Sequence, residues 1–354
     1  MLIPHLSSLD GYGSKPFMGL LIRSTISLYR TAYLLVPVLL VSSIVVAGET
    51  PASPPFHEGQ VLEARTGQAI PFDDFLGQVA AQDVVYLGEE HQNRSHVEAA
   101  VRILEGLLAK HRQPILALEM FSWDGQTGID RYVSGEALSK ADFLQESHWE
   151  ENWGGGFENY EPLVTFAREH RLSVLALNPP RSLVRLVAGK GMAQALTSSE
   201  MDRWGMKNET FAEDPAYREM IVEPLRQCHG GMSDDRYQRM YEASVFRDEG
   251  MAKTIAVALR QIRVRQESTA ATNPNGSRPG PIVSYTGGGH IQYYLPVPHR
   301  VLRRISAPVK QVSIYLAALE PGREDEIREY LRNGIADYVW VTALGAHGVP
   351  KRCK

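Results

Sequence analysis

The apolar segments of this chain end in polar residues that are able to bind ligands. Near-continuous apolar runs are typical of parallel strands buried on both faces, and in open α/β sheets ligands bind beyond the carboxyl ends of such strands. The sequence therefore predicts that the polar side chains meet at one edge of one sheet. The runs and the residues after them are 84–88 before Glu89, Glu90 and His91; 115–118 before Glu119; 174–177 before Asn178; and 282–286 before glycines 287–289 and His290.

Amphipathic helical patterns separate these strands, so the chain is expected to be α/β, with a mostly parallel sheet flanked by helices over residues 55–343. Asn93 is placed to cap a helix that runs to about Lys110, and the proline pair 179–180 predicts a helix from Arg181 onward. The predicted strands are 83–88, 115–119, 173–178, 281–286, 310–317 and 336–342.

Two stretches interrupt the alternation of strands and helices. Residues 123–157 contain short helices around three tryptophans, and residues 190–263 contain helical patterns but no strand pattern. These two insertions are expected to form a smaller helical subdomain beside the sheet. Residues 264–280 are polar and rich in Pro, Gly, Asn and Ser, a composition that predicts a flexible loop.

Residues 1–47 have the pattern of a secretory signal peptide. Arg23 and Arg30 precede a short apolar stretch that ends at Ala47 in Val-x-Ala. Pro37 interrupts this stretch, which is shorter than the roughly 18 to 20 apolar residues of a membrane-spanning helix. Export to the periplasm or cell envelope is therefore expected. No cysteine stands at the cleavage point, so a lipid anchor is not indicated there.

Composition excludes some classes of protein. With 354 residues, 44% of them hydrophobic and 22% charged, the chain is typical of a globular protein. Its formal net charge is −4 and it has no basic stripe, which argues against nucleic-acid binding. Cys228 and Cys353 are too few for a disulfide scaffold and are expected not to pair.

Two motifs of identical spacing, Gly88-x-x-His91 and Gly287-x-x-His290, lie at strand ends. Such spacing occurs by chance, so the placement carries more weight than the spacing. A glycine allows a sharp turn there, and neutral imidazole is the commonest protein metal ligand. The alternative is that each histidine caps its strand and bonds a neighbouring loop. The pair, together with Glu119, favours a metal site formed by His91, Glu119 and His290.

The carboxylates admit more than one role. Glu119 ends a buried strand, where it is expected to bind a metal, act as a base, or pair with Arg181 or Arg247. Glu89 and Glu90 point to opposite sides of an extended segment, so one is expected to face the site. If the protein is a hydrolase, that residue is the candidate general base.

Five further residues are candidates for contact with a cofactor. Haem binds non-covalently through His or Tyr ligands, whereas the Cys-x-x-Cys-His motif for covalent attachment is absent. For each candidate a structural role, on a helix surface, in a turn or in the core, competes with the functional one. The five are His96, Asn178, Arg181, Tyr293 and Tyr294.

Five blocks of the sequence resemble the ChaN-type haem-binding family. In order, they are Leu87-Gly88-Glu89-Glu90-His91-Gln92-Asn93, Ala117-Leu118-Glu119-Met120-Phe121, Leu175-Ala176-Leu177-Asn178-Pro179-Pro180-Arg181, Arg247-Asp248-Glu249-Gly250-Met251-Ala252 and Gly287-Gly288-Gly289-His290. The resemblance covers about residues 60–320 and extends to the wider superfamily of Tiki metalloproteases, TraB proteins and erythromycin esterases.

The resemblance implies that His91, His290, Glu119 and one of Glu89 or Glu90 form the shared site. ChaN-type proteins are iron-regulated, envelope-located haem binders, often lipoproteins and dimeric, which implies haem as the ligand, a homodimer and peripheral membrane association. The missing lipidation cysteine departs from that pattern and favours a soluble exported protein. Tiki-type proteins instead use the paired motifs for metal-dependent peptide cleavage. A haem-binding protein of iron uptake and a hydrolase with a divalent metal ion are therefore both open from sequence.

Overall fold

A single mixed sheet organises the protein. The structure, a computed structural model, describes residues 56–272, 277–346 and 348. The strands lie in the order β2-β1-β8-β7-β3-β6-β4-β5. The strands are β1 (Val61–Glu63), β2 (Ala69–Ile70), β3 (Val84–Glu89), β4 (Arg112–Ser122), β5 (Val174–Asn178), β6 (Arg278–Gly287), β7 (Gln311–Ala318) and β8 (Tyr338–Thr342).

Strands β3 to β8 all run parallel to one another, which confirms the predicted parallel sheet and its six strands. Only β1 and β2 differ: β1 is antiparallel to β8 and forms a hairpin with β2. This hairpin was not expected, because strands of three and two residues are too short to give a period-two pattern.

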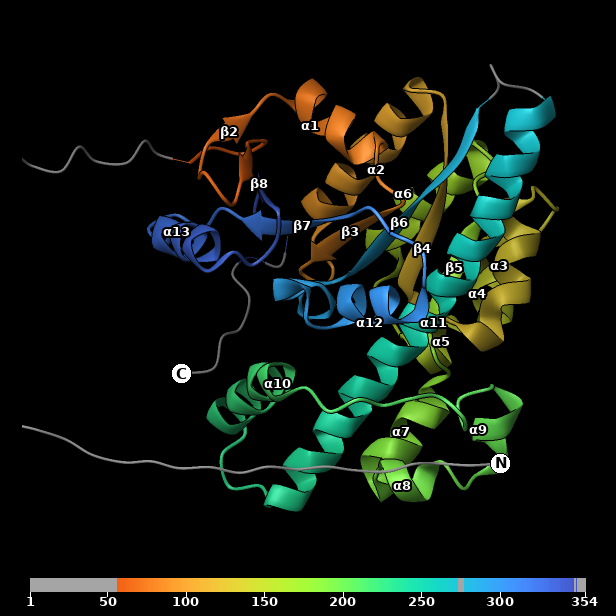
Figure 1. The fold of residues 1–354 in the computed structure, drawn as a ribbon, viewed down its shortest axis with the longest axis vertical. Helices are drawn as coiled ribbons and strands as arrows, with labels where there is room; N and C mark the ends of the chain where they lie inside the picture. Colours follow the sequence, from red (N-terminus) through yellow and green to blue (C-terminus); the bar gives the residue numbers. More distant parts are fainter. Residues whose placement is uncertain (1–55, 273–276, 347, 349–354) are drawn as a thin grey trace, which may run out of the picture. The chain divides into compact units, whose positions relative to one another are not determined.

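Helices cover both faces of the sheet (Figure 1). They are α1 (Phe72–Ala80), α2 (Arg94–Ala109), α3 (Gln126–Val133), α4 (Lys140–Glu146), α5 (Trp149–Asn152), α6 (Phe157–Glu169), α7 (Arg181–Lys190), α8 (Met192–Ala195), α9 (Ser199–Arg203), α10 (Pro215–Cys228), α11 (Asp234–Thr272), α12 (Val297–Arg304) and α13 (Glu324–Asn333). None of the helices in the described part of the chain is both long and apolar enough to cross a membrane.

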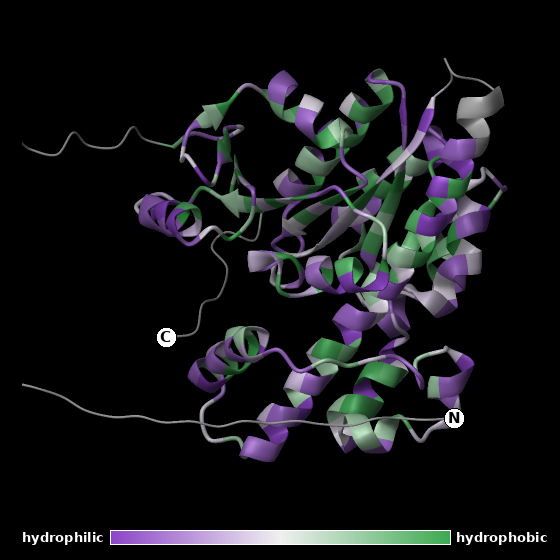
Figure 2. Ribbon diagram, in the orientation of Figure 1, coloured by the Kyte–Doolittle hydropathy of each residue, from purple (hydrophilic) through white to green (hydrophobic). Residues whose placement is uncertain are grey.

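Alternate residues of a strand pack into two separate hydrophobic cores, one on each face of the sheet. Val85 and Leu87 of β3 pack with α1, α2 and α6, whereas Val84 and Tyr86 pack with α11 and α12. Figure 2 accordingly shows strands that are mostly green or white and helices banded in purple and green. Burial on both faces explains the near-continuous apolar runs in the sequence.

The predicted helix boundaries near the site are confirmed. Asn93 caps α2, and its side-chain oxygen accepts a hydrogen bond from Ser95 N at 3.0 Å. Helix α7 begins at Arg181, directly after the proline pair. The chain therefore leaves β3 and β5 by short turns, which keeps the residues of those turns at the carboxyl edge of the sheet.

Only the second of the two predicted insertions forms a smaller helical subdomain. Residues 123–157 instead belong to the core over the sheet, where Ile129, Phe143 and Trp149 pack with α2 and α6. Two apolar clusters hold α7 to α10 against the first half of α11, with Phe246 in one cluster and Tyr217, Tyr241 and Val245 in the other. In Figure 1 these helices form the lower group, and α11 continues from them to the sheet. Helix α11 thus joins the subdomain to the α/β core.

Two further expectations fail in this region. Helix α11 runs to Thr272 and β6 begins at Arg278, so most of residues 264–280 is not a loop. Cys228, the last residue of α10, is disulfide-bonded, so the expectation that it stays unpaired is wrong. The signal peptide expected at residues 1–47 lies outside the described residues.

Candidate functional site

The register of the central strands brings the two Gly-x-x-His motifs together. Glu89 of β3 lies opposite Gly287 of β6, and Gly88 lies opposite Thr286. Strand β4 is the next neighbour of β6, and Gly287 N donates a hydrogen bond to Oε2 of Glu119 at 2.6 Å. The sequence expectation that His91, Glu119 and His290 share one edge of the sheet is therefore confirmed.

Glu119 is the centre of a buried ion cluster. Its Oε1 accepts a hydrogen bond from Arg247 Nη2 at 2.5 Å and lies 3.2 Å from His290 Nε2. Burial alone would raise the pKa of Glu119, but His290 and Arg247 outweigh burial and hold that pKa well below its usual range. Of the roles open from sequence, pairing with Arg247 is the one present.

His290 is bonded through both ring nitrogens. Its Nδ1 lies 2.5 Å from Asp248 Oδ1, and its Nε2 contacts Glu119. Burial opposes a charge on this imidazole, yet the two carboxylates outweigh burial and raise the pKa of His290 to about 9. Both ring nitrogens of His290 therefore have a carboxylate partner.

His91 differs from His290 in both the exposure of its side chain and its hydrogen bonding. Its side chain is 48% exposed, against 14% for His290. Nδ1 lies 2.5 Å from Glu89 Oε1, whereas Nε2 makes no hydrogen bond to any residue that the structure describes. The Trp153 ring stands edge-on to the imidazole, with centroids 4.9 Å apart. His91 therefore keeps one ring nitrogen available to a ligand.

The buried carboxylate of Glu89 contacts the imidazole of His91 on the side that faces the protein interior. Its carboxylate is fully buried and accepts hydrogen bonds from the hydroxyls of Tyr160 and Tyr285, each at 3.3 Å. Burial raises the pKa of Glu89. Burial would lower the pKa of His91, but the hydrogen bond to Glu89 and the charges of Glu119 and Glu89 outweigh burial and raise that pKa. The pair therefore binds the proton between Nδ1 and Oε1 tightly.

A cavity of about 400 Å³ opens beside His91. Five of the predicted or related site residues line it, namely His91, Glu119, Asn178, Arg181 and Arg247. The rest of its lining is Gln92, Met120, Phe121, Ser122, Asn152, Trp153, Gly154, Pro179 and Val184. This volume falls within the range of small-molecule sites, roughly 300–1,000 Å³.

Asn178 and Arg181 take their places in this cavity through the turn after β5. Asn178 Nδ2 donates to the backbone oxygen of Glu119 at 2.6 Å, and Asn178 Oδ1 accepts from Arg247 Nε at 3.3 Å. The exposed Arg181 side chain reaches Glu151 O at 3.4 Å. Both residues were expected from sequence, and both face the cavity.

Four other predicted residues lie away from the cavity lining. Glu90 N donates to Nδ1 of His96 at 2.9 Å, and His96 is buried under α2, where burial lowers its pKa to about 3. Tyr293 N bonds Ile335 O at 2.8 Å, and the Tyr294 hydroxyl donates to Asp337. Of the adjacent glutamates, Glu89 rather than Glu90 faces the site.

The expected metal set of His91, Glu119 and His290 is not formed. Within the described ranges, no group of three or more His, Cys, Asp or Glu side chains is placed to hold a metal ion. The three residues are neighbours, but Glu119 and His290 neutralise each other.

Sequence reasoning missed four residues of the site. Asp248 orients His290, Tyr160 and Tyr285 support Glu89, and Trp153 flanks His91. Asp248 had a visible signal, because Arg247-Asp248-Glu249 places three charges together in the middle of a buried helix. The two tyrosines had none, since buried tyrosines resemble ordinary core residues.

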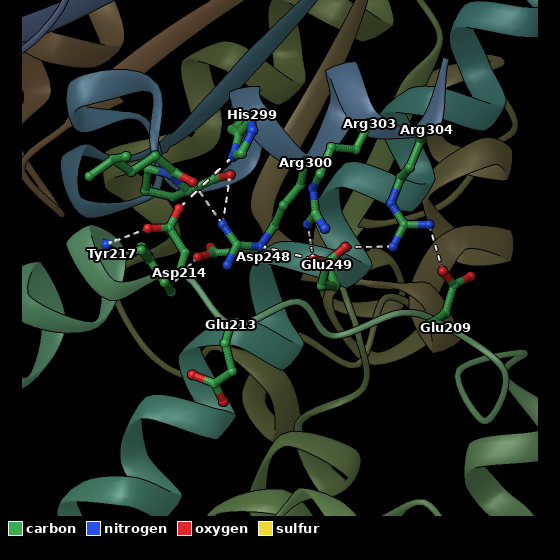
Figure 3. A network of polar contacts seen from close by, with 12 residues as sticks. Glu209, Glu213, Asp214, Tyr217, Asp248, Glu249, His299, Arg300, Arg303 and Arg304 are labelled. Carbon is green, nitrogen blue, oxygen red and sulfur yellow. Dashed lines mark hydrogen bonds and ion pairs between the residues drawn. The ribbon is translucent and has the colours of Figure 1, made fainter. Parts of the chain in front are cut away.

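Glu249, the next residue along α11, anchors that helix to α12 (Figure 3). Arg300, Arg303 and Arg304 of α12 all contact its carboxylate. On the other side, Tyr217 of α10 donates to Asp248. These contacts fix the stretch of α11 that carries Arg247 and Asp248, and so fix the position of His290.

An open cavity at the carboxyl edge of a parallel sheet, with one available imidazole, defines an α/β ligand-binding protein. The sequence matches the family described as "Haem-binding uptake, Tiki superfamily, ChaN" over residues 75–301, and the chain belongs to this family. Its function is thus of the haem- or iron-related kind, and its ligand is a small molecule.

Two further comparisons find similar proteins, and the first of them, a solved structure, agrees on the fold. The structure titled "Cofacial heme binding to ChaN of Campylobacter jejuni" superposes with a TM-score of 0.56 and 17% identity, covering 80% of this chain and 98% of that one. "Protein RETICULATA-RELATED 5, chloroplastic" of Arabidopsis thaliana is 26% identical over 279 residues, 73% of this chain. The chain spans about a third (34%) of the length of that curated relative.

Proposed function

We propose that this protein binds haem in the cavity beside His91, whose Nε2 would be available to hold the group. Membership of the haem-binding family supports this proposal. The single observation that carries it is the state of His91, whose Nδ1 is held by a buried carboxylate while Nε2 makes no bond to the described residues. Metal-binding histidines are commonly held in this way.

The lining of the cavity fits the chemistry of a porphyrin. Met120, Phe121 and Trp153 offer apolar surface to a flat ring system, and Arg181 offers a cationic group to its carboxylates. When bound, haem supplies an iron whose properties depend on the axial ligand and the polarity around it.

Different residues around the cavity have different roles in the proposed haem binding. Glu89 orients the His91 ring, and Trp153 limits access of water to that ring. The Arg247–Glu119–His290 cluster fixes the wall of the cavity from below, so that ligand binding requires little rearrangement. The proposed role is binding without turnover, as in storage or transfer of haem.

We further propose that the protein acts after export, in haem handling or iron uptake in the periplasm or cell envelope. The leader-like pattern of residues 1–47 supports export. A homodimer and peripheral association with a membrane belong to the same proposal. Size-exclusion chromatography with and without haemin, and fractionation of the expressing cells, test them.

The proposal is tested by titrating the purified protein with haemin. The wild type should give a saturable shift of the Soret band, and His91→Ala should lose it. His170→Ala is the matched control, because His170 is an exposed histidine at the end of α6, and it should bind haemin as the wild type does. A wild type that shows no saturable binding, or a His91→Ala variant that binds normally, contradicts the proposal.

A further inference from the structure

We propose that a second cavity, at the amino edge of the sheet, binds a small molecule that carries several carboxylates. This cavity has a volume of about 800 Å³ and shares no lining residue with the cavity beside His91. Its volume falls within the range of small-molecule sites, roughly 300–1,000 Å³. The inference goes beyond haem binding, because the two cavities lie at opposite edges of the sheet.

Segments from distant parts of the sequence form the walls of this second cavity. They are the turn between β1 and β2, the end of α1, the end of α13, and the first residues of β7 and β8. Leu62 of β1 packs with Ile327 of α13 in one apolar cluster, and both elements lie at the left of Figure 1. Ala64 N donates to Asp337 O at 2.8 Å and so ties the turn to β8. The fold therefore fixes the walls.

Two glutamines of the lining are oriented by tyrosines. The hydroxyl of Tyr86, a fully buried residue of β3, donates to Gln311 Oε1 at 3.3 Å. The hydroxyl of Tyr338, which is also buried, donates to Gln78 Oε1. Because each amide oxygen faces a tyrosine, the NH₂ group of each glutamine is left to face the cavity. Neither NH₂ group donates to a residue that the structure describes.

The acceptors around the cavity are already engaged. Glu63 accepts a hydrogen bond from Thr66 Oγ1 at 2.7 Å. Asp337 accepts from Ser313 N at 2.8 Å and from the Tyr294 hydroxyl. The last turns of α1 and α13 also end at the cavity, where backbone N–H groups cap carbonyls of both turns. The cavity therefore presents mainly hydrogen-bond donors to a ligand.

Two arginines add positive charge to these donors. Arg65 lies in the β1–β2 turn and Arg332 in the last turn of α13. The Arg65 side chain is 82% exposed and lies 3.6 Å from Glu63, an exposed ion pair of the kind that contributes little. Arg332 forms no ion pair within the described ranges.

This set of groups selects among ligand classes. A carboxylate oxygen only accepts hydrogen bonds, and it suits both a guanidinium and an amide NH₂ group. A ligand with several carboxylates can therefore bond the two arginines and the two glutamines together. The hydroxyls of a neutral sugar would instead bring donors that find few free acceptors in this cavity.

The test is an NMR titration of the ¹⁵N-labelled protein with citrate, a tricarboxylate, and with glucose, a neutral polyol. Citrate should shift the side-chain NH₂ signals of Gln78 and Gln311 in a saturable way. Glucose at the same concentrations should leave these signals unchanged. The protein needs no bound haem for this measurement.

Two variants change the donors without removing the support beneath them. Gln311→Glu keeps an acceptor for Tyr86 but replaces the NH₂ donor by a carboxylate. Arg332→Gln removes an exposed cation and leaves the core untouched. Each should weaken citrate binding roughly tenfold or more, because a charge-assisted contact is lost. Gln194→Glu, at an exposed position of α8, is the matched control and should bind citrate as the wild type does.

The outcomes decide the inference apart from the proposed function. Saturable citrate shifts that weaken in both variants and persist in the control support it. A wild type without saturable shifts, an unchanged affinity in either variant, or glucose binding equal to that of citrate overturns it. Arg332→Gln decides alone if Gln311→Glu does not fold. Haemin binding enters none of these results, so either proposal can fail without the other.

Discussion

His290 Nε2 lies 3.2 Å from Glu119 Oε1, and this contact separates the roles of the two Gly-x-x-His motifs. The motifs have the same spacing and lie on adjacent parallel strands. His290 nevertheless belongs to a buried cluster of ions, whereas His91 faces a cavity. Identical local sequence thus gives one structural and one ligand-binding histidine, because their neighbours on β4 and α11 differ.

We predict that His290→Ala destabilises the fold. The substitution leaves Glu119 and Asp248 as buried carboxylates that have lost a cationic partner, a loss that typically costs about 3–5 kcal/mol. Urea unfolding should show that loss, while the exposed control His170→Ala should stay within about 0.5 kcal/mol of the wild type. An unchanged urea midpoint for His290→Ala would mean that the cluster is not an ion cluster in solution.

We predict a loss of stability in mild acid that is due to His96. Burial lowers the pKa of His96 to about 3 in the folded protein, from its ordinary value of 6.5. A group with a depressed pKa stabilises the fold above the unfolded value, and this contribution is lost as the pH falls from about 6.5 towards 3. Between about pH 7 and pH 5 the cost is about 2 kcal/mol.

The measurement is urea unfolding of the wild type and of His96→Leu at both pH values. Leucine cannot take up a proton, so the variant should lose about 2 kcal/mol less than the wild type over the same range. Equal losses in the two proteins would show that His96 is not held neutral by burial.

The sequence predicted the sheet edge well because strand ends and turn residues are local signals. The six parallel strands, the Asn93 cap and the meeting of His91 with Glu119 all follow from patterns within a few residues. Bonding at the site was not local. Which histidine keeps Nε2 available depends on Glu119 and Asp248, which come from other strands and helices, and on Tyr285, which looks like a core residue.

Two predictions from the sequence were wrong, namely the loop at 264–280 and the placement of Tyr293 and Tyr294 at the site, and each has a specific physical cause. A loop was predicted over 264–280 because that stretch is polar and rich in Pro, Gly, Asn and Ser, but Arg265, Gln266 and Glu267 are strong helix formers and continue α11. Tyr293 and Tyr294 follow His290 closely in sequence, yet their φ angles of 57° and 60° turn the chain towards β7 and β8. Two consecutive left-handed residues are not visible in the sequence when neither is glycine.

We predict that Gln126→Ala weakens the exposed edge of the sheet. Strand β5 is an edge strand, and the side chain of Gln126 takes the place of a further strand. Its Oε1 accepts from Ala176 N at 2.8 Å, and its Nε2 donates to Val174 O at 2.8 Å. Loss of both bonds should cost about 1–3 kcal/mol and leave a strand edge free to pair with other chains.

Urea unfolding and light scattering on warming test the role of Gln126, with Thr127→Ala as the control because Thr127 is the exposed next residue of α3. The Gln126 variant should unfold at lower urea and aggregate at lower temperature than the control. Equal behaviour of the two variants would show that solvent replaces the side-chain amide without cost.

We predict that Gly287→Ala weakens haem binding, because the site needs a residue without a Cβ at this position. An added Cβ would lie 2.8 Å from Cε1 and 3.1 Å from Nε2 of His91, so the ring would have to move. The backbone itself accepts alanine, since the φ of Gly287 is −55°. Overpacking of this kind costs about 1–3 kcal/mol, or about a tenfold to hundredfold loss of affinity.

Gly289→Ala is the control, because its Cβ would meet only Gln292 Nε2 at 3.6 Å. Haemin titration of both variants should therefore show a loss for Gly287→Ala alone, and equal affinities would place the bound ligand away from His91.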